Sequence, residues 1–216
     1  RRVLFRSDSP PPGAHIHPPS AIVFGSFNNI AKISAGTVRA WSEILGAVPG
    51  SRLVLKSAPL DFHDTADRVL EAFEEFGIAA GRIELRGWAV QREGHLKMYE
   101  DIDIALDTFP YNGTTTTCEA LWMGVPVVTL AGDRHSARVG NSILNAVGLG
   151  SLAARDPEQY VKIAAALAAK PAELAKLRAD LRPRLSRSPL LDARRMAREQ
   201  EKVYRAAWQR WCAATP

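Results

Sequence analysis

Short apolar runs alternate with helical patterns five times between residues 21 and 148, and this alternation constrains the fold more than any other feature of the chain. The runs are apolar nearly throughout, which is typical of parallel strands that are covered on both faces. They predict strands at Ala21–Ser26, Arg52–Ser57, Arg82–Gly87, Ile102–Asp107 and Val125–Leu130.

The segments between these strands have the apolar spacing of helices. They predict helices at Ala35–Ala47, Phe62–Phe76, Glu93–Tyr99, Thr115–Met123 and Ser136–Val147. Gly77, Gly124 and Gly148 lie at helix ends, where glycine suits the left-handed backbone conformation. Alternation of this kind predicts an α/β fold, a Rossmann-like doubly wound parallel sheet closed by C-terminal helices.

After Leu152 the pattern is helical to the end of the chain, over Pro157–Ala169, Pro171–Leu185 and Leu191–Trp211. The last of these segments carries charged residues between apolar positions, together with Tyr204, Trp208 and Trp211. Because aromatic side chains are commonly core residues, we expect this amphipathic helix to pack across the domain.

The start of the chain differs in composition from the rest. Residues 1–7, RRVLFRS, resemble the translated read-through of a sequencing adapter, and we interpret them as an artefact, so that the natural protein would extend further toward its N-terminus. Residues 8–20 contain five prolines and are predicted to form a linker in which His15 and His17 are solvated. Residues 21–216 are then expected to form one lobe.

Composition excludes several classes of protein. With 46% hydrophobic and 24% charged residues the chain matches a globular domain, and it has neither the apolar run of a membrane span nor a signal peptide, so a cytoplasmic location is expected. The net charge of +5 arises largely at the two ends and accompanies no nucleic-acid motif, so no nucleic-acid partner is expected. Cys118 and Cys212 lie in no metal-ligand spacing.

The loop after the fourth predicted strand, from Asp107 to Glu119, carries the strongest chemical signal. Thr114, Thr115 and Thr116 open a helix whose first backbone N–H groups have no intrahelical partner. These amides, the helix dipole and the threonine hydroxyls together predict an anion site suited to a diphosphate. Glu119 follows one turn later, where a carboxylate could accept hydrogen bonds from a ribose. The alternative is that the threonines only cap the helix.

Two further loops carry polar candidates. After the first strand, Asn28 and Asn29 offer amide donors and Lys32 can reach a phosphate, although a solvated lysine is an equal alternative. This loop has neither a Walker motif nor G-x-G-x-x-G, which argues against a phosphate-loop NTPase and a dinucleotide enzyme. After the third strand, His95 lies inside a predicted helix and could face a nucleoside, or could simply be a surface residue.

Three segments together show a more specific pattern: FGSFNNIAKI, then HLKMYEDIDIALDTFPYNGTTTTCEALWMGVPVVTLAG, then RVGNSILNAVGLG. They resemble the C-terminal catalytic lobe of the SPINDLY and O-linked N-acetylglucosamine transferase family, and the similarity runs from about Val23 to Trp211. The resemblance implies a two-lobed GT-B glycosyltransferase preceded by tetratricopeptide repeats. It also implies that this chain is the lobe that binds the donor nucleotide, without its N-terminal catalytic lobe.

The resemblance assigns residues to the two ends of the donor. At the diphosphate end, Asn29 matches an amide position and Lys32 matches the catalytic lysine that neutralises the phosphates. Thr115 and Thr116 match the threonines that cradle them.

At the nucleoside end, His95 matches a histidine beside the nucleoside and Glu119 an acidic residue on the ribose. Two positions depart from the animal enzymes, since Thr114 replaces a histidine and Met98 an arginine. Both departures favour the plant SPINDLY side of the family, whose members use GDP-fucose.

The sequence therefore predicts inverting transfer of a sugar to Ser or Thr hydroxyls of a protein acceptor, from UDP-N-acetylglucosamine or alternatively from GDP-fucose. A non-catalytic nucleotide-sugar-binding module and a GT-B enzyme acting on lipid or glycan remain open. No metal and no cofactor besides the donor are expected, because Asp101 and Asp103 lie at the beginning of the fourth predicted strand, away from the ligand end. His63 and His135 are interpreted as surface residues, although His135 follows the fifth predicted strand and could line the cleft. No obvious general base remains, so the chain alone is expected to bind nucleotide weakly and to transfer no sugar.

Overall fold

The computed structural model describes residues 9–12, 17–18, 21–88 and 92–214, so the predicted artefact at residues 1–7 and the expectation for His15 lie outside the described residues. Its centre is a six-stranded parallel sheet with the order β3-β2-β1-β4-β5-β6, which confirms the predicted doubly wound α/β class. The strands are β1 (Val23–Ser26), β2 (Arg52–Lys56), β3 (Ile83–Arg86), β4 (Ile104–Leu106), β5 (Val127–Leu130) and β6 (Ala153–Ala154).

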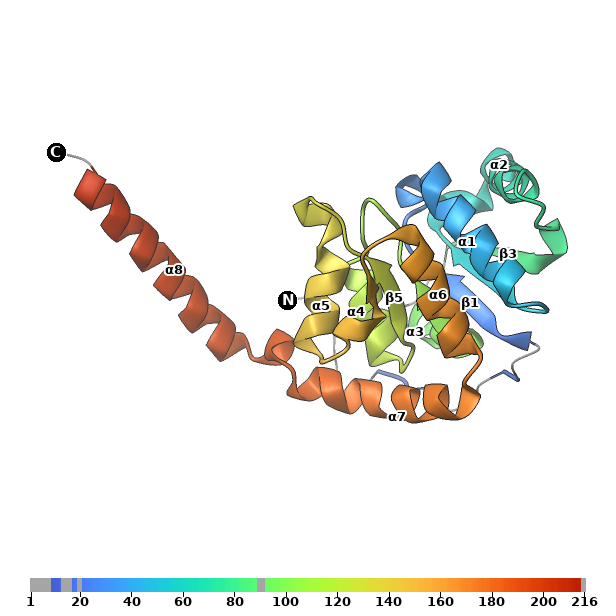
Figure 1. Ribbon diagram of the computed structural model, residues 1–216. Helices are drawn as coiled ribbons and strands as arrows, with labels where there is room; N and C mark the ends of the chain where they lie inside the picture. The colour runs from blue at the N-terminus through green and yellow to red at the C-terminus, as the bar shows by residue number, and fades with distance from the viewer. Residues whose placement is uncertain (1–8, 13–16, 19–20, 89–91, 215–216) are drawn as a thin grey trace.

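Helices cover both faces of this sheet (Figure 1). One face packs against α1 (Ala35–Ala47), α2 (His63–Glu74) and α6 (Pro157–Ala168). The other packs against α3 (Arg92–Lys97), α4 (Thr115–Trp122) and α5 (Val139–Ala146), while α7 (Pro171–Arg187) leads to α8 (Ala193–Ala214). Short 3-10 helices lie at Ile30–Lys32 (η2), Ala58–Asp61 (η3), Ala80–Arg82 (η4), Met98–Asp101 (η5), His135–Ala137 (η6), Gly150–Leu152 (η7) and Pro189–Leu191 (η8).

The two faces of the sheet have separate cores because successive side chains of a strand point to opposite sides. Phe24 belongs to the core beneath α1 and α6, where Trp41 is fully buried. Its neighbour Val23 belongs to the core beneath α4 and α5. In the central strands, apolar residues occupy positions that face either side of the sheet. The sequence therefore shows continuous apolar runs rather than an alternating pattern.

Three helices are followed by the glycines that the sequence predicts at their ends. Gly77, Gly124 and Gly148 have φ values of 75°, 76° and 72°, a region that side chains with a Cβ rarely adopt. These three glycines reverse the chain after α2, α4 and α5, so that each helix returns directly to the following strand or turn.

Helix α7 is fixed to the rest of the domain by one buried and one half-buried arginine. The Arg178 guanidinium, 3% exposed, donates from Nη1 to the carbonyls of Ile102 and Asp103 at 2.8 and 2.9 Å. Arg182 donates from Nε to the carbonyl of Trp122 at 2.7 Å. Because charge-assisted hydrogen bonds of this kind are the stronger ones, α7 is part of the domain and closes the end of the sheet from which the strands start.

Two sequence predictions are wrong in detail. The stretch after Leu152 is not purely helical, because Ala153 and Ala154 form β6 and pair with Thr129 and Leu130; two residues are too few to give a periodic signal. His17 is not solvated either: its side chain is 24% exposed, and its Nδ1 lies 2.9 Å from the buried carboxylate of Asp103.

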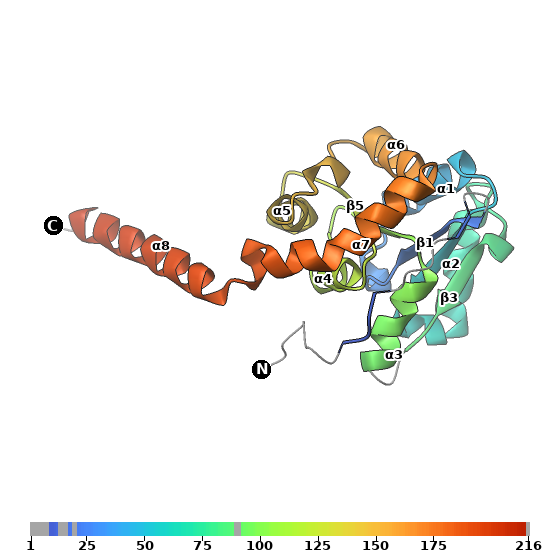
Figure 2. The same ribbon diagram turned by 90° about the horizontal axis from the view of Figure 1, so that it is seen from below.

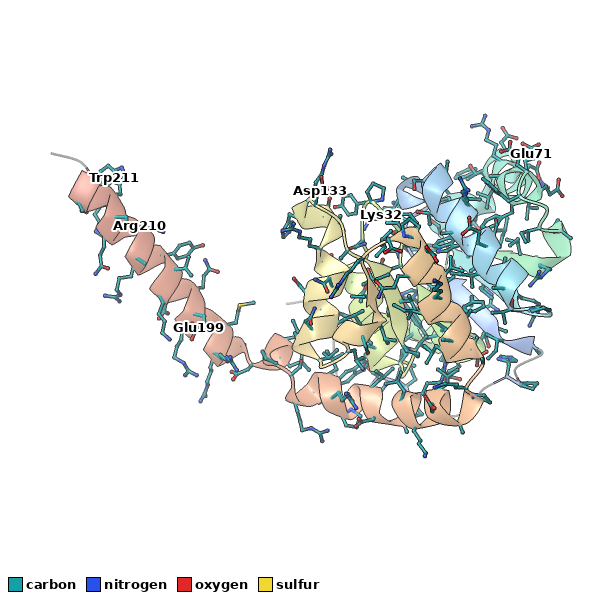
Figure 3. All side chains as sticks on the ribbon, in the orientation of Figure 1. Lys32, Glu71, Asp133, Glu199, Arg210 and Trp211 are labelled. Carbon is teal, nitrogen blue, oxygen red and sulfur yellow. The ribbon has the colours of Figure 1, made fainter. Side chains whose placement is uncertain are left out.

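Helix α8 does not pack across the domain as the sequence predicted. Figures 1 and 2 show it pointing away from the other elements, and every one of its residues is exposed. Figure 3 shows Trp211 near the end of this helix that lies away from the sheet. Tyr204, Trp208 and Trp211 are 67%, 62% and 59% exposed, so they are not core anchors. An amphipathic pattern indicates an apolar face but does not identify what covers it.

None of the helices in the part of the chain that the structure describes is both long enough and apolar enough to span a lipid bilayer.

Deleting residues 193–214 is expected to leave the free energy of unfolding of the domain unchanged within about 0.5 kcal/mol, because the deletion removes no buried side chain. Circular dichroism melts of the full and shortened chains would measure this. A fall in Tm of several degrees, or loss of the cooperative transition, would show that α8 packs on the domain in solution.

Candidate functional site

Polar side chains gather at the carboxyl ends of β1 and β4, which are neighbours in the sheet although they are distant in the sequence. In a doubly wound sheet this is the switch point at which ligands bind. A depression there is lined by residues that follow the two strands and begin α4, among them Ser26, Asn28, Asp107, Thr116 and Thr117. Lys32 lies at the edge of the domain opposite α7 (Figure 3).

Asp107 is the buried centre of this cluster, with an exposed fraction of 1%. Its Oδ1 accepts hydrogen bonds from the backbone amides of Gly113 at 2.6 Å and Thr108 at 2.9 Å, and its Oδ2 accepts one from the Thr129 hydroxyl at 2.7 Å. Burial raises the pKa of this carboxyl to about 6, against the lowering effect of its hydrogen bonds and of the Lys32 charge.

The loop between β4 and α4 is held by a second buried side chain, Asn112. Its amide nitrogen donates to the carbonyls of Thr108 at 2.9 Å and Leu130 at 3.3 Å, and its oxygen accepts from the Gly140 amide at 3.3 Å. The structure shows that Asn112 joins the loop to β5 and α5.

The same loop is fixed from the other face of the sheet. The Tyr160 hydroxyl, on α6, donates to the backbone carbonyl of Asp107 at 2.9 Å and accepts from the indole nitrogen of Trp41 at 3.0 Å. Both side chains are fully buried. The carboxyl end of β4 is therefore connected by hydrogen bonds to the layer formed by α1 and α6.

Lys32 is placed beside the loop by η2. Its ammonium donates to the backbone carbonyl of Asn112 at 3.0 Å and lies 4.1 Å above the centre of the Tyr111 ring. Burial lowers the pKa of the ammonium, while the negative charge of Asp107 raises it. Lys32 thus provides a cation directly next to the segment that precedes α4 and is not simply solvated, while its contact with a phosphate stays a prediction.

The first turn of α4 presents backbone amides at the same place. Thr114 and Thr115 are exposed, and Thr114 makes no capping hydrogen bond with its side chain. Thr116 donates from its hydroxyl to Oδ1 of Asn28 at 2.8 Å, which joins the helix start to the loop after β1. Thr116 thus has a partner outside the helix, so the threonines do not only cap it. The first-turn amides have no partner within the helix, and the predicted anion contact stays a prediction.

The two asparagines after β1 differ in their roles. Asn28 is buried, and its amide nitrogen lies 3.4 Å from both the Ser26 hydroxyl and Oδ1 of Asp107, so it is engaged with the protein itself. Asn29 is exposed and caps η2, accepting from the Ala31 amide at 3.0 Å. The amide nitrogen of Asn28 is therefore engaged with the protein, whereas the bond of Asn29 uses only its side-chain oxygen, and its role as an amide donor stays a prediction.

His95 and Glu119 meet at the other end of the cluster. Nε2 of His95 lies 3.0 Å from Oε2 of Glu119, and its Nδ1 lies 3.1 Å from the ammonium of Lys56, which ends β2. The rings of Phe27 and Tyr99 pack against the imidazole with centroid distances of 6.1 and 5.7 Å. His95 is thus not a lone surface histidine but part of a partly buried polar chain.

The structure brings together most of the predicted site residues, with Lys32, Asn28 and Thr116 around the loop and His95 with Glu119 beside it. The sequence missed Asp107 and Lys56 as site residues. The position of Asp107 at a strand end was a usable signal, since such residues face the switch point. Lys56 also ends a strand, but its partner His95 is supplied by a different βα unit and could not be identified from the sequence.

Solved structures share this fold. A mutant O-GlcNAc transferase from Thermobaculum terrenum superposes with a TM-score of 0.84 at 39% sequence identity, over 95% of this chain and 40% of that chain. The parallel sheet, its helical layers and the polar loops at its switch point define one lobe of a GT-B glycosyltransferase.

The chain belongs to glycosyl transferase family 41, whose sequence model matches residues 14–200. It is 44% identical over 191 residues to the probable UDP-N-acetylglucosamine–peptide N-acetylglucosaminyltransferase SPINDLY of Solanum lycopersicum, and 32% identical over 199 residues to the UDP-N-acetylglucosamine–peptide N-acetylglucosaminyltransferase of Caenorhabditis elegans. These matches cover 88% and 92% of this chain but 20% and 17% of those proteins. The chain thus spans about a fifth of the length of these relatives, and the expected resemblance is confirmed.

Proposed function

We propose that this chain is the donor-binding lobe of a glycosyltransferase that moves N-acetylglucosamine from UDP-N-acetylglucosamine to Ser or Thr hydroxyls of proteins, with inversion at the sugar. The observation that carries the proposal is the position of Lys32 beside the loop that opens α4, at the switch point of the sheet. The names of the relatives, which include this donor and a peptide acceptor, support it.

The chemistry of the site suits a departing nucleoside diphosphate. Negative charge grows on the phosphate oxygens as the sugar leaves, and preorganised donors stabilise such charge most effectively. Lys32 supplies a cation, and the amides at the start of α4 supply neutral donors. The Asp107 and Asn112 hydrogen bonds hold the loop between them in place before the donor arrives.

The remaining parts of the reaction belong to other segments of the natural protein. Inversion requires an acceptor hydroxyl and a base behind the anomeric carbon, and the described residues offer no histidine for this role. His95 is engaged with Lys56 and Glu119, and His17 is engaged with Asp103. His63 and His135 are exposed. We infer that the N-terminal lobe and tetratricopeptide repeats supply the acceptor site, and that the protein acts in the cytoplasm.

Calorimetric titration of the purified chain with UDP and GDP side by side tests the proposal. We expect UDP to bind weakly but measurably and GDP to bind at least tenfold more weakly. A preference for GDP would replace N-acetylglucosamine by fucose as the transferred sugar. Binding of neither nucleotide would refute the donor-binding role.

Nucleotide binding is expected to be independent of divalent cations, because Lys32 and the α4 amides take the place of a metal ion in stabilising the charge of the diphosphate. Among the described residues no group of three or more His, Cys, Asp or Glu side chains could hold a metal ion. Titration of UDP with and without EDTA should give the same affinity within twofold. A loss of affinity on chelation that added Mg²⁺ restores would show that a cation takes part.

A further inference from the structure

Lys56 is a buried cation that the proposed function leaves without a role. It is the last residue of β2 and is 9% exposed, which is rare for lysine unless its charge is paired. Its ammonium lies 3.1 Å from Nδ1 of His95 and 5.6 Å above the centre of the Trp88 ring. Burial lowers the pKa of this ammonium, and the nearby charge of Glu119 raises it. A buried cation of this kind needs a partner whose attraction offsets the free-energy cost of its desolvation.

The hydrogen bonds of Lys56 determine the protonation of its neighbour. An ammonium can only donate, so Nδ1 of His95 must accept and cannot carry a proton. In a neutral imidazole the proton then resides on Nε2, which faces Oε2 of Glu119 at 3.0 Å. A carboxylate can only accept, so both ends of the imidazole are satisfied by one tautomer alone.

Two aromatic rings pack against the imidazole of His95 and restrict its rotation. Phe27 and Tyr99, whose own centroids are 4.5 Å apart, both contact the His95 ring. Glu119 is 8% exposed on the buried side of α4. Two hydrogen bonds, from Lys56 to His95 and from His95 to Glu119, therefore connect β2, α3 and α4. Both point the same way, from the ammonium donor through the imidazole to the carboxylate acceptor.

We propose that Lys56 is a positioning residue of the donor site, which fixes the tautomer of His95 and through it the orientation of the Glu119 carboxylate toward the ribose hydroxyls. This inference rests on the proposed function and on the expectation from the sequence that Glu119 binds the ribose. It assigns Lys56 to the nucleoside end alone, because its contacts are with His95 and Trp88, whereas the diphosphate end is built from Lys32 and the start of α4.

Nitrogen spectra of the histidine side chains test the first half of the proposal without any ligand. In the ¹⁵N-labelled full chain at mildly alkaline pH we expect His95, assigned by its loss in His95→Gln, to show a protonated Nε2 and an unprotonated Nδ1. Lys56→Met should convert it to a mixture of tautomers, and Lys56→Arg, which keeps an N–H donor, should restore the single form. A protonated Nδ1 in the wild-type chain would overturn the proposal, whether or not the variants fold.

Binding of UDP and of inorganic pyrophosphate tests the second half. Lys56→Met should weaken UDP binding by at least tenfold and leave pyrophosphate binding within twofold of wild type, whereas Lys32→Met should weaken both. The exposed Lys176 on α7 gives a matched control, and Lys176→Met should change neither. Equal losses of UDP and pyrophosphate affinity in Lys56→Met would refute a role confined to the nucleoside end. Failure of the wild-type chain to bind UDP would instead refute the proposed function itself.

Discussion

Replacing Lys32 with methionine is expected to lower the affinity of the chain for UDP by about tenfold to a hundredfold, because a hydrogen bond between charged groups contributes about 1.5 to 3 kcal/mol. Methionine keeps the apolar stem of the side chain and its contact with the Tyr111 ring, so the loss isolates the ammonium. Calorimetry or displacement of a fluorescent nucleotide would measure it, with circular dichroism to confirm that the fold is retained.

Salt provides the internal control for this experiment. Wild-type affinity for UDP should fall as ionic strength rises. The Lys32 ammonium is partly exposed, so salt screens its attraction to the diphosphate. The Lys32→Met protein should show a shallower dependence, and Lys176→Met should behave as the wild type. Wild-type UDP affinity in Lys32→Met would contradict the placement of the diphosphate beside Lys32.

Replacing Asp107 with asparagine is expected to stabilise the folded chain by ~3 kcal/mol at neutral pH. The folded state binds the Asp107 proton more tightly than the unfolded chain, because burial raises the pKa to about 6 from 3.8. Asparagine cannot ionise, so it avoids the cost of a buried negative charge. Its oxygen can still accept from the Gly113 and Thr108 amides, while the Thr129 hydroxyl turns to accept from its nitrogen.

The pH dependence of unfolding gives the sign of this effect. The contribution of Asp107 to stability is complete below about pH 4, where both states hold the proton, and is lost as pH rises to about 6. The difference between the Asp107→Asn and wild-type chains in urea melts should therefore grow over this range and stay constant above it. The exposed Asp133 supplies a control, and Asp133→Asn should change stability by less than 0.5 kcal/mol. A difference that does not vary with pH would show that the Asp107 pKa is not raised.

The sheet was predictable because its five longer strands are apolar on both faces, and because glycines such as Gly77 and Gly124 end helices at recognisable places. The short β6 was not, since strand pairing of Ala153 and Ala154 depends on β5 rather than on a local pattern. The position of α8 was not predictable either: its pattern shows an apolar face, but contact with the domain depends on surfaces that no local sequence describes.

The site was predictable to the extent that its residues follow strand ends. Lys32 and the threonines of α4 lie in the loops where a doubly wound sheet binds ligands, and the family resemblance marked the same positions. The contact of Lys56 with His95 was hidden because it joins separate βα units. The buried state of Asp107 was hidden for a similar reason, since its hydrogen-bond donors come from several segments of the chain.

The hydrogen bonds from Trp41 through Tyr160 to the carbonyl of Asp107 have a consequence for how a ligand is received. Binding loops commonly belong to the least protected parts of a protein and open independently of the core. Here the loop after β4 is attached to the centre of the α1–α6 layer, so its Gly113 amide should exchange with solvent hydrogen only when the whole domain opens. A nucleotide therefore meets a surface that is already ordered, and its association loses little backbone entropy in this loop.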